Sequence, residues 1–393
     1  MGPWPFHSNM SVISSIHEDH GATFGERAGR TIVEHYGRPE RTHRAVRNGV
    51  GLIELAYGVI TVTGEDRRDY VDNVVSNHVP ETDGQGCYAL VLGPQGRIEV
   101  ELYIYNAGER ILLFTPPGEA KELAADWSEK VFIQDVEIDV ATDEFAIFGI
   151  HGPQATEKVA SVLNGAASPD ERYSFVRGTM GDAGVSVIRT DALTGEETYE
   201  VICGIDDVEA VYDVLLNQGL NAAPFGYRTR DSLALESGSA LFETELEGTV
   251  PNVLGLTTAL DFEKGCYVGQ EVVSRVENRG QPSRRLIGLT IEVDAASEPE
   301  AEAEPESHTD ADAAELVPNP GAAVFDGDAS VGEISRAGLS PLLETPIALA
   351  LLEYDHEGES FTVRVGGEEV PATRTELPFV EGSDVSDRLP DYS

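Results

Sequence analysis

The chain contains the run Lys264-Gly265-Cys266-Tyr267-Val268-Gly269-Gln270-Glu271, in which two glycines bracket a cysteine and a tyrosine. Glycine tolerates tight and left-handed turns that other residues resist, so we predict a loop here. Val272, Val273 and Val276 follow with helical spacing, which predicts a helix directly after the loop. A thiol beside a lysine and before a helix N-terminus has a lowered pKa, which favours the reactive thiolate. Cys266 is therefore either a nucleophilic or metal-binding thiol or, like most free cysteines, a small buried hydrophobic residue.

The composition is that of a strongly acidic globular protein. The 393 residues include 70 Asp and Glu against 27 Lys and Arg, which gives a formal net charge of −43. Such charge destabilises a compact state by self-repulsion unless salt screens it, so we interpret the composition as adaptation to a salt-rich cytoplasm. The alternative is a nucleic-acid mimic or an acidic interaction protein, which the spread of acid over the whole chain disfavours. The same charge disfavours nucleic acid as a partner.

The sequence also bears on location and on metals. No run approaches the ~18 apolar residues of a membrane span, and the N-terminus lacks the pattern of a signal peptide. Cys87, Cys203 and Cys266 are far apart and form no Cys-x-x-Cys pair, so neither a zinc site nor a disulfide framework is indicated. We expect a cytoplasmic protein with reduced thiols, no membrane partner and no bound metal. His17 and His20 share one face of an expected helix and are predicted to be surface residues, because a catalytic metal site needs more ligands.

A β-hairpin is predicted from strands over residues 87–92 and 97–105, joined by the turn Gly93-Pro94-Gln95-Gly96. In the second strand, acids and tyrosines alternate with apolar residues, and a period of two places them on one face. The residues of this face are Glu99, Glu101, Tyr103 and Tyr105. The face is either a polar surface in solvent or the wall of a site for a flat, hydrogen-bonding aromatic ligand such as a pterin.

Other segments are assigned from periodicity and composition. Residues 11–50 are predicted to be helical and amphipathic, with Gly49 as the C-cap. Strands over residues 136–140 and 145–150 are expected to pair with each other. Residues 292–316 consist largely of Ala, Glu, Asp, Pro and Ser, which predicts a disordered acidic loop. Beyond that loop, short apolar runs separated by Asp-Gly and Gly-Gly turns predict a small β-barrel.

The chain is long enough for two or three domains. We predict a tail and helix over residues 1–43 and a mixed region over residues 44–284. A C-terminal β-barrel over residues 285–384 follows, interrupted by the acidic loop. Strands mixed with helices and then an all-β tail are typical of the α+β class.

The run Lys264–Glu271 resembles the signature of the YgfZ-type folate-binding proteins, whose relatives serve iron–sulfur cluster assembly. These proteins resemble the T-protein of the glycine cleavage system, an aminomethyltransferase, whose corresponding loop usually lacks the cysteine. Further matches to the family are Thr194-Gly195-Glu196-Glu197-Thr198-Tyr199-Glu200, the segment from Phe225 to Gly238, and Ser340 to Ala350. The resemblance spans roughly Arg44 to Val380. It implies folate-binding, aminomethyltransferase-like N-terminal domains followed by a small β-barrel.

The resemblance also implies a ligand and its binding residues. The cofactor is tetrahydrofolate or a one-carbon-substituted form of it, and Glu200 is expected to hydrogen-bond its pterin ring. The other expected pocket residues are Tyr88, Tyr103 and Glu101. Arg230 is expected to meet the acidic tail of the folate, and its alternative is an intrahelical ion pair, for example with Asp231 or Glu236. Leu193 replaces a tyrosine of the family, which removes part of the ring contact.

Three functions follow from the resemblance. The first is a tetrahydrofolate-binding protein of the YgfZ type that supports iron–sulfur cluster assembly or maintenance, with Cys266 as its functional thiol. The second is an aminomethyltransferase that moves a one-carbon unit from a lipoyl-bound amine to tetrahydrofolate. The third is a non-catalytic folate-binding regulatory module. The cysteine motif favours the first, which implies iron–sulfur proteins as partners. The segment Thr194–Glu200 is closer to the T-protein pattern and favours the second, which implies a lipoyl carrier protein.

Glu101 is a catalytic candidate together with Cys266 and Lys264. It stands where the T-protein resemblance places an aspartate that assists the transfer, and general acid–base work needs a carboxylate within hydrogen-bond reach. The extra methylene of glutamate shifts the carboxylate by about 1 Å, a misplacement that can cost ~100-fold in rate. Val100 replaces the other acid of the T-protein pair. Both substitutions weaken the second hypothesis without excluding it.

Overall fold

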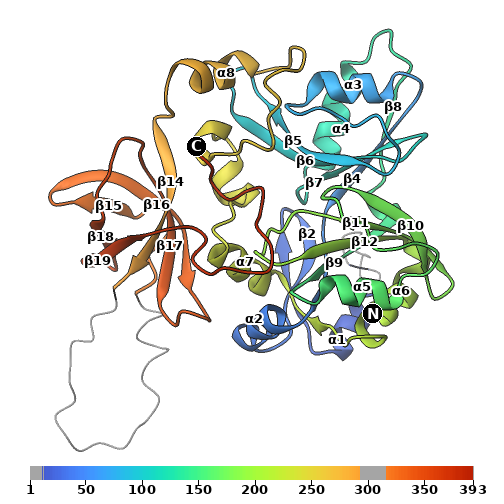
Figure 1. The fold of residues 1–393 in the computed structure, drawn as a ribbon, viewed down its shortest axis with the longest axis horizontal. Helices are drawn as coiled ribbons and strands as arrows, with labels where there is room; N and C mark the ends of the chain where they lie inside the picture. Colours follow the sequence, from blue (N-terminus) through green and yellow to red (C-terminus); the bar gives the residue numbers. More distant parts are fainter. Residues whose placement is uncertain (1–10, 12, 293–315, 393) are drawn as a thin grey trace, which may run out of the picture. The chain divides into compact units, whose positions relative to one another are not determined.

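The computed structural model describes residues 11, 13–292 and 316–392 and divides into two compact units (Figure 1). The first unit comprises Met1–Ala192, Glu196–Arg230 and Thr258–Val272. The second comprises Leu193–Gly195, Asp231–Thr257 and Val273–Ser393. The predicted disordered loop over residues 292–316 lies, except for its two end residues, outside the described residues.

The first unit is built on two sheets. The five-stranded sheet has the order β5-β6-β7-β4-β8, and the six-stranded sheet has the order β10-β11-β12-β9-β3-β13. The strands of the first are β4 Gly58–Thr63, β5 Gly86–Leu92, β6 Ile98–Asn106, β7 Ile111–Thr115 and β8 Glu137–Val140. Those of the second are β3 Gly51–Glu54, β9 Phe145–His151, β10 Phe175–Met180, β11 Ala183–Arg189, β12 Thr198–Gly204 and β13 Ala223–Pro224. The chain passes between the sheets more than once, so the two halves are intertwined.

Helices cover the outer faces of the two sheets (Figure 1). Helices α3 (Arg67–Val74) and α4 (Ala120–Glu129) pack on the five-stranded sheet, and their apolar residues share one core with strands β4 to β7. Helices α5 (Ala155–Val162) and α6 (Val208–Asn217) pack on the six-stranded sheet in a second core. The inner faces of the two sheets, which no helix of the described chain covers, face each other, and the candidate site lies between them.

The predicted helix over residues 11–50 is wrong in its middle, where a β-hairpin forms. The elements of this segment are α1 Ser14–Asp19, β1 Thr23–Arg27, β2 Arg30–His35 and α2 Pro39–Asn48. Ala28 and Gly29 both have positive φ, 46° and 77°, which is the left-handed pair that a two-residue hairpin turn requires. Ile32 and Val33 are β-branched and buried in β2, so strand propensity and burial outweigh the helical spacing. Helix α2 ends before Gly49, as predicted.

Two further expectations are corrected by the fold. Strands β8 and β9 do not pair with each other, because β8 pairs with β4 and β9 pairs with β12 and β3. Strand β9 is almost wholly apolar and is buried inside its sheet, whereas β8 is an exposed edge strand. His17 is buried rather than on the surface. Its Nε2 lies 2.7 Å from Glu54 Oε2, and the hydroxyl of Tyr36 lies 2.7 Å from its Nδ1.

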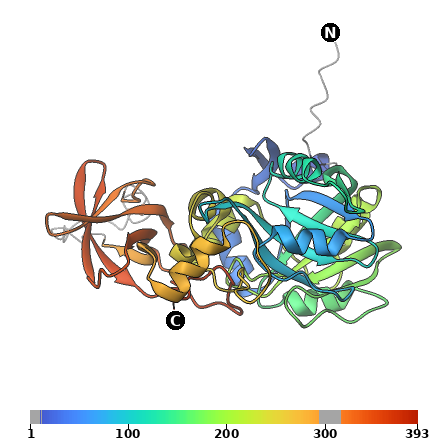
Figure 2. The ribbon, with the colours of Figure 1, turned by 90° about the horizontal axis from the view of Figure 1, so that it is seen from above.

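The second unit contains a closed barrel, which confirms the predicted β-barrel. Its strands, orange to red in Figures 1 and 2, have the order β14-β17-β16-β15-β18-β19. They are β14 Arg284–Ile291, β15 Ala323–Asp326, β16 Ala329–Leu339, β17 Pro346–Glu353, β18 Ser360–Val365 and β19 Glu368–Thr375. Helix α7 (Tyr227–Glu236) ends in this unit, where the buried Glu236 accepts hydrogen bonds from Ser340 Oγ at 2.5 Å and the Leu342 amide at 3.2 Å.

Candidate functional site

From Val100 onward, strand β6 buries both of its faces, whereas Glu99 near its start is exposed. Val100, Leu102 and Ile104 belong to the core beneath α3 and α4. On the opposite face, Glu101 and Tyr103 are 7% and 4% exposed, so this face is not a solvent-facing polar surface. A carboxylate is costly to bury unless hydrogen bonds or charge compensate it, and it therefore marks a specialised region of the interior.

The neighbouring strand β5 brings Tyr88 to the same face. Tyr88 lies directly opposite Tyr103 in the antiparallel register, and their ring centroids are 5.2 Å apart. The Tyr88 hydroxyl donates a hydrogen bond to Glu101 Oε2 at 2.9 Å. The structure thus brings together three of the residues predicted to line the pocket, and Tyr88 orients the carboxylate of Glu101.

Glu200 is joined to this group through a residue that the sequence did not single out. It lies on β12, is 2% exposed, and accepts a hydrogen bond at 2.9 Å on Oε1 from the hydroxyl of Tyr57. The ring of Tyr57 stacks on Phe114 with centroids 5.7 Å apart and meets Tyr103 edge-on at 6.2 Å. The segment between β3 and β4 has no periodicity that marks Tyr57 as functional.

Further aromatic rings complete a cluster between the two sheets. Tyr105 is fully buried and contacts Phe114 at 5.4 Å and Phe175 at 6.2 Å. Burial raises the pKa of Tyr105 well above its usual range, and the negative charge of Glu200 raises it further. The hydroxyl of Tyr105 therefore stays protonated. Tyr173 has a positive φ of 62°, which is rare for a bulky residue, and its ring lies 6.0 Å from Tyr103. Sequence reasoning missed Tyr173 as well.

Arg230 belongs to α7 and lies beside a tyrosine and a buried histidine. Its guanidinium carbon is 5.4 Å from the ring centroid of Tyr227, and Arg27 lies against the same ring at 4.7 Å. Burial, followed by the positive charge of Arg230, lowers the pKa of His151 to about 3. His151 is therefore neutral at physiological pH, and its Nδ1 lies 3.1 Å from Thr198 Oγ1. Arg230 supplies positive charge to this part of the first unit.

Lys264 is directed toward the end of α3. Its Nζ donates hydrogen bonds to the carbonyls of Asp72, Val75 and Asn77 at 2.6, 3.0 and 2.7 Å. Burial lowers its pKa, although the nearby Asp72 carboxylate, 3.7 Å away, opposes that shift. The last carbonyls of a helix lack intrahelical hydrogen-bond donors, and the Lys264 ammonium donates to them instead. These contacts give Lys264 a structural task, whatever part it plays in chemistry.

Cys266 lies in an exposed loop before α8 (Gln270–Arg279), and that helix begins where the sequence predicted it. Cys87 and Cys203 are both buried, and burial raises the pKa of each to about 12. Cys266 is therefore the accessible thiol of the three.

No group of three or more histidine, cysteine or acidic side chains in the described part of the chain is placed to hold a metal ion. None of the helices that the structure describes has the length and apolar character that crossing a bilayer requires.

Two intertwined α+β halves, a polar aromatic cluster between their sheets and a closed C-terminal barrel define an aminomethyltransferase-like fold. Two family descriptions match the chain: the GCVT N-terminal domain over residues 13–264 and the glycine cleavage T-protein C-terminal barrel domain over residues 308–381. The chain therefore belongs to the glycine cleavage T-protein superfamily.

Individual relatives agree with this assignment. The chain is 29% identical over 381 residues to an aminomethyltransferase of Saccharopolyspora erythraea, covering 94% of this chain and 97% of the relative. It is 28% identical over 366 residues to an aminomethyltransferase of Thermus thermophilus, covering 92% and 95%. The crystal structure of the glycine cleavage system aminomethyltransferase T from Bartonella henselae has the same fold, with a TM-score of 0.80 at 22% identity, over 96% of this chain and all of that one. The narrower resemblance to YgfZ-type proteins stays a prediction.

Proposed function

We propose that this protein is a tetrahydrofolate-dependent aminomethyltransferase that takes its one-carbon unit from an aminomethyl group on a lipoyl carrier protein. The observation that carries the proposal is the connected set of residues between the two sheets. Glu200, Tyr57, Tyr103, Tyr88 and Glu101 form this set, with a buried carboxylate at each end. The relatives named aminomethyltransferase favour this function over the first of the three hypotheses drawn from the sequence.

The cluster has the chemistry that a pterin needs. A pterin presents several N–H donors in one plane, and a buried carboxylate such as Glu200 accepts such donors through charge-assisted hydrogen bonds. Each bond of this kind contributes about 1.5–3 kcal/mol. The flat rings of Tyr57, Tyr88 and Tyr103 supply apolar area with polar tips for the two faces and edges of a planar ligand. Arg230 offers positive charge for the carboxylates of a folate tail.

Glu101 is the residue best placed to move a proton. Bound tetrahydrofolate supplies the nitrogen nucleophiles that accept the one-carbon unit. Glu101 is buried, and the Tyr88 hydroxyl at 2.9 Å from Oε2 holds its carboxylate in one orientation. A carboxylate fixed in this way can take the proton that a folate nitrogen releases, and general acid–base catalysis of this kind contributes 10²–10⁴-fold in rate. Glu101 and Tyr103 are 7% and 4% exposed, so little solvent reaches the carboxylate.

Two variants separate binding from transfer. Glu200→Gln removes the charge that accepts the pterin donors, so we expect the Kd for tetrahydrofolate to rise at least tenfold in calorimetric titration. Glu101→Gln keeps the shape of the side chain but cannot take a proton. We expect this variant to bind tetrahydrofolate within about threefold of the wild type and to release ammonia from an aminomethyl-loaded carrier at least ~100-fold more slowly. Glu99→Gln, an exposed acid on the same strand, is the matched control.

The outcomes decide between the functions. If the wild type does not bind tetrahydrofolate, or Glu200→Gln binds it as well as the wild type, the pocket is not a folate site. If the wild type binds folate but releases no ammonia from a loaded carrier, a non-catalytic folate-binding module is left. Molar potassium chloride should be used throughout, because the chain carries a net charge of −43 that salt must screen.

A second function, support of iron–sulfur proteins, is favoured by one observation: the exposed thiol of Cys266 in the Lys264–Glu271 loop. Cys266→Ala should leave tetrahydrofolate binding and aminomethyl transfer unchanged in either case. In cells that lack this protein, only the iron–sulfur function predicts that the alanine variant fails to restore the activity of iron–sulfur enzymes. Full restoration by Cys266→Ala would rule out a role for this thiol.

A further inference from the structure

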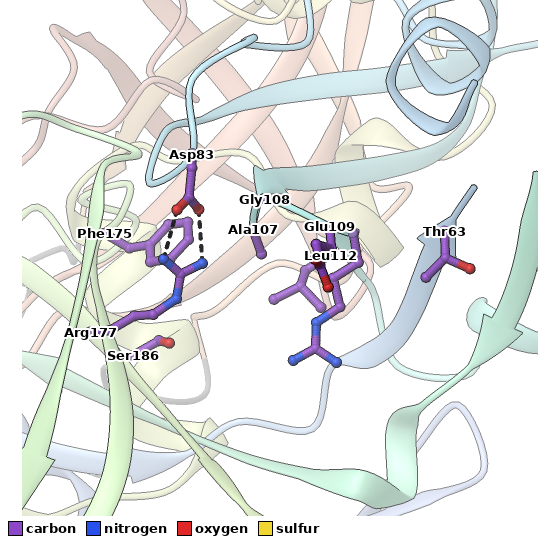
Figure 3. Close-up of a pocket in the computed structure, with 10 residues that line it drawn as sticks. Thr63, Asp83, Ala107, Gly108, Glu109, Leu112, Phe175, Arg177 and Ser186 are labelled. Atoms are coloured by element: carbon purple, nitrogen blue, oxygen red, sulfur yellow. Dashed lines mark hydrogen bonds and ion pairs between the residues drawn. The ribbon is translucent and has the colours of Figure 1, made fainter. Parts of the chain in front are cut away.

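A pocket of about 810 Å³ lies in the first unit, and neither Glu101 nor Glu200 is among the residues that line it (Figure 3). Its lining comes from the end of β4, the turn between β6 and β7, the loop before β5, and strands β10 and β11. Figure 3 shows Asp83, Phe175, Arg177 and Ser186 gathered at one end, Thr63 at the other, and Glu109 and Leu112 between them. The volume is in the range of sites for small organic ligands.

The pocket shares a wall with the folate site. Phe175 lines it, and the ring of Phe175 also contacts Tyr105 at 6.2 Å inside the aromatic cluster. Leu112 lines it from β7, the strand that also carries Phe114. The two sites are therefore neighbours with separate polar groups, and the residues proposed to hold folate are not among those that line this pocket.

One of the two lining arginines is already neutralised. Arg177 donates two parallel hydrogen bonds to Asp83, at 2.9 and 2.8 Å, and its guanidinium lies 5.0 Å from the Phe175 ring centroid. These hydrogen bonds lower the pKa of Asp83, so the pair stays ionised and internally balanced. The two parallel hydrogen bonds give this pair a defined geometry at one end of the pocket.

The second arginine is available to a ligand. Arg110 is exposed, and its guanidinium lies 5.6 Å from the ring centroid of Phe145. Within the residues that the structure describes, Arg110 forms no ion pair with a carboxylate. A guanidinium presents a planar fork of donors that matches the oxygens of a carboxylate or phosphate.

We propose that this pocket is a second binding site, for an organic oxyanion whose carboxylate or phosphate is held by Arg110. The hydroxyls of Thr63 and Ser186 are additional donors along the pocket, and Leu112 and Phe175 provide apolar contact for the body of the ligand. Glu109 is the lining carboxylate that opposes an anion, since Asp83 is balanced by Arg177. The proposal does not depend on the folate function of the neighbouring site.

The test uses the full chain and three probes in calorimetric titrations at moderate and molar potassium chloride. Phenyl phosphate and benzoate combine an oxyanion with a flat ring, and inorganic phosphate lacks the ring. We expect saturable 1:1 binding of phenyl phosphate or of benzoate, according to the head group that the site prefers. Inorganic phosphate should bind more weakly, because it has no ring to bury against Leu112 and Phe175. Arg110→Ala should weaken the preferred probe at least tenfold, because it removes a charge-assisted pair.

Two further variants test whether the bound ligand is an anion and whether it binds in this pocket. Glu109→Gln should strengthen binding, because it removes the opposing charge. Arg284→Ala, which removes an exposed arginine paired with Glu333 in the barrel at 2.6 Å, should leave binding unchanged. The proposal is overturned if neither ring-bearing probe saturates the wild type, if Arg110→Ala binds as the wild type does, or if Arg284→Ala loses as much affinity as Arg110→Ala. Tetrahydrofolate affinity measured on Arg110→Ala should stay at the wild-type value, which shows that the sites are separate.

Discussion

Lys264 offers the sharpest test of how the motif loop works, because its ammonium donates three hydrogen bonds to backbone carbonyls. Lys264→Met keeps the length and apolar stem of the side chain and removes the ammonium. The wild-type Nζ lies 2.6, 3.0 and 2.7 Å from the carbonyl oxygens of Asp72, Val75 and Asn77, at the end of α3. Without the ammonium these carbonyls lose a charged donor at a helix C-terminus, where a cation also opposes the negative end of the helix dipole.

The magnitude follows from these contacts. A hydrogen bond to a charged group contributes about 1.5–3 kcal/mol net, but three bonds to one ammonium do not add fully, and burying that ammonium costs part of the gain. We expect Lys264→Met to lower the unfolding free energy of the first unit by about 3 kcal/mol. For a unit of this size the thermal midpoint should fall by about 6–12 °C.

The measurement is scanning calorimetry of the full chain in molar potassium chloride, combined with hydrogen exchange of the α3 amides. Hydrogen exchange reports local unfolding of α3 directly. This measurement is needed because a chain with two units need not unfold in one step, so the calorimetric midpoint alone does not report on α3. Lys130→Met is the matched control. Lys130 is exposed at the C-cap of α4 and pairs with Asp126 at 2.6 Å, so its loss should cost less than about 0.5 kcal/mol. If Lys264→Met kept the wild-type midpoint and α3 protection but lost aminomethyl transfer, the amine would act in the chemistry and the structural reasoning would be refuted.

Two other predictions concern thiols and a buried lysine. Brief alkylation at neutral pH, followed by mass spectrometry, should modify Cys266 first. Burial raises the pKa of Cys87 and Cys203 from 9.0 to about 12, which lowers the thiolate fraction of each about 1000-fold. Earlier labelling of either buried thiol would contradict the burial argument. Burial also lowers the pKa of Lys158 from 10.5 to about 8, so between these pH values the unfolded chain binds more protons and the contribution of Lys158 to stability rises with pH. The difference in unfolding free energy between wild type and Lys158→Met should therefore grow from pH 8 to 9.5 by up to ~1.4 kcal/mol per pH unit, and a flat difference would be inconsistent with this shift.

The strongest periodic signals predicted structure correctly. In β6 a period of two placed Glu101 and Tyr103 on one face, and that face is the wall of the candidate site. The turns of the C-terminal region likewise indicated a barrel. Such signals survive because side chains alternate between the two faces of any strand, and each strand must bury its apolar face whichever strands it pairs with.

Residues outside periodic segments were not predictable in this way. Tyr57 and Tyr173 lie in connections, and their roles depend on which strands the fold brings opposite them. The hairpin of β1 and β2 was not predicted, because its apolar spacing also fits a helix. The left-handed turn at Ala28 and Gly29 distinguishes a hairpin from a helix, and that turn is visible only in the structure. The oxyanion pocket is assembled from several distant segments, so no stretch of sequence contains it.

The motif loop shows how a short signature can combine structural and chemical residues. Lys264 fastens one end of the loop to α3, and the buried Tyr267 packs beneath it. At the other end Gly269 has φ of +82°, and a Cβ there would lie 2.7 Å from the carbonyl oxygen of Gly93. Only glycine allows this approach of the loop to the turn between β5 and β6.

Cys266 differs from these neighbours, because it is exposed and the loop is held without it. The lysine, tyrosine and second glycine are thus explained by packing alone, in a T-protein fold with or without iron–sulfur chemistry. The cysteine is the one residue among these four that packing does not explain. Among these four residues, Cys266 is the one that can be replaced by alanine without removing a contact that holds the loop, so Cys266→Ala tests a chemical role of the thiol apart from the stability of the fold.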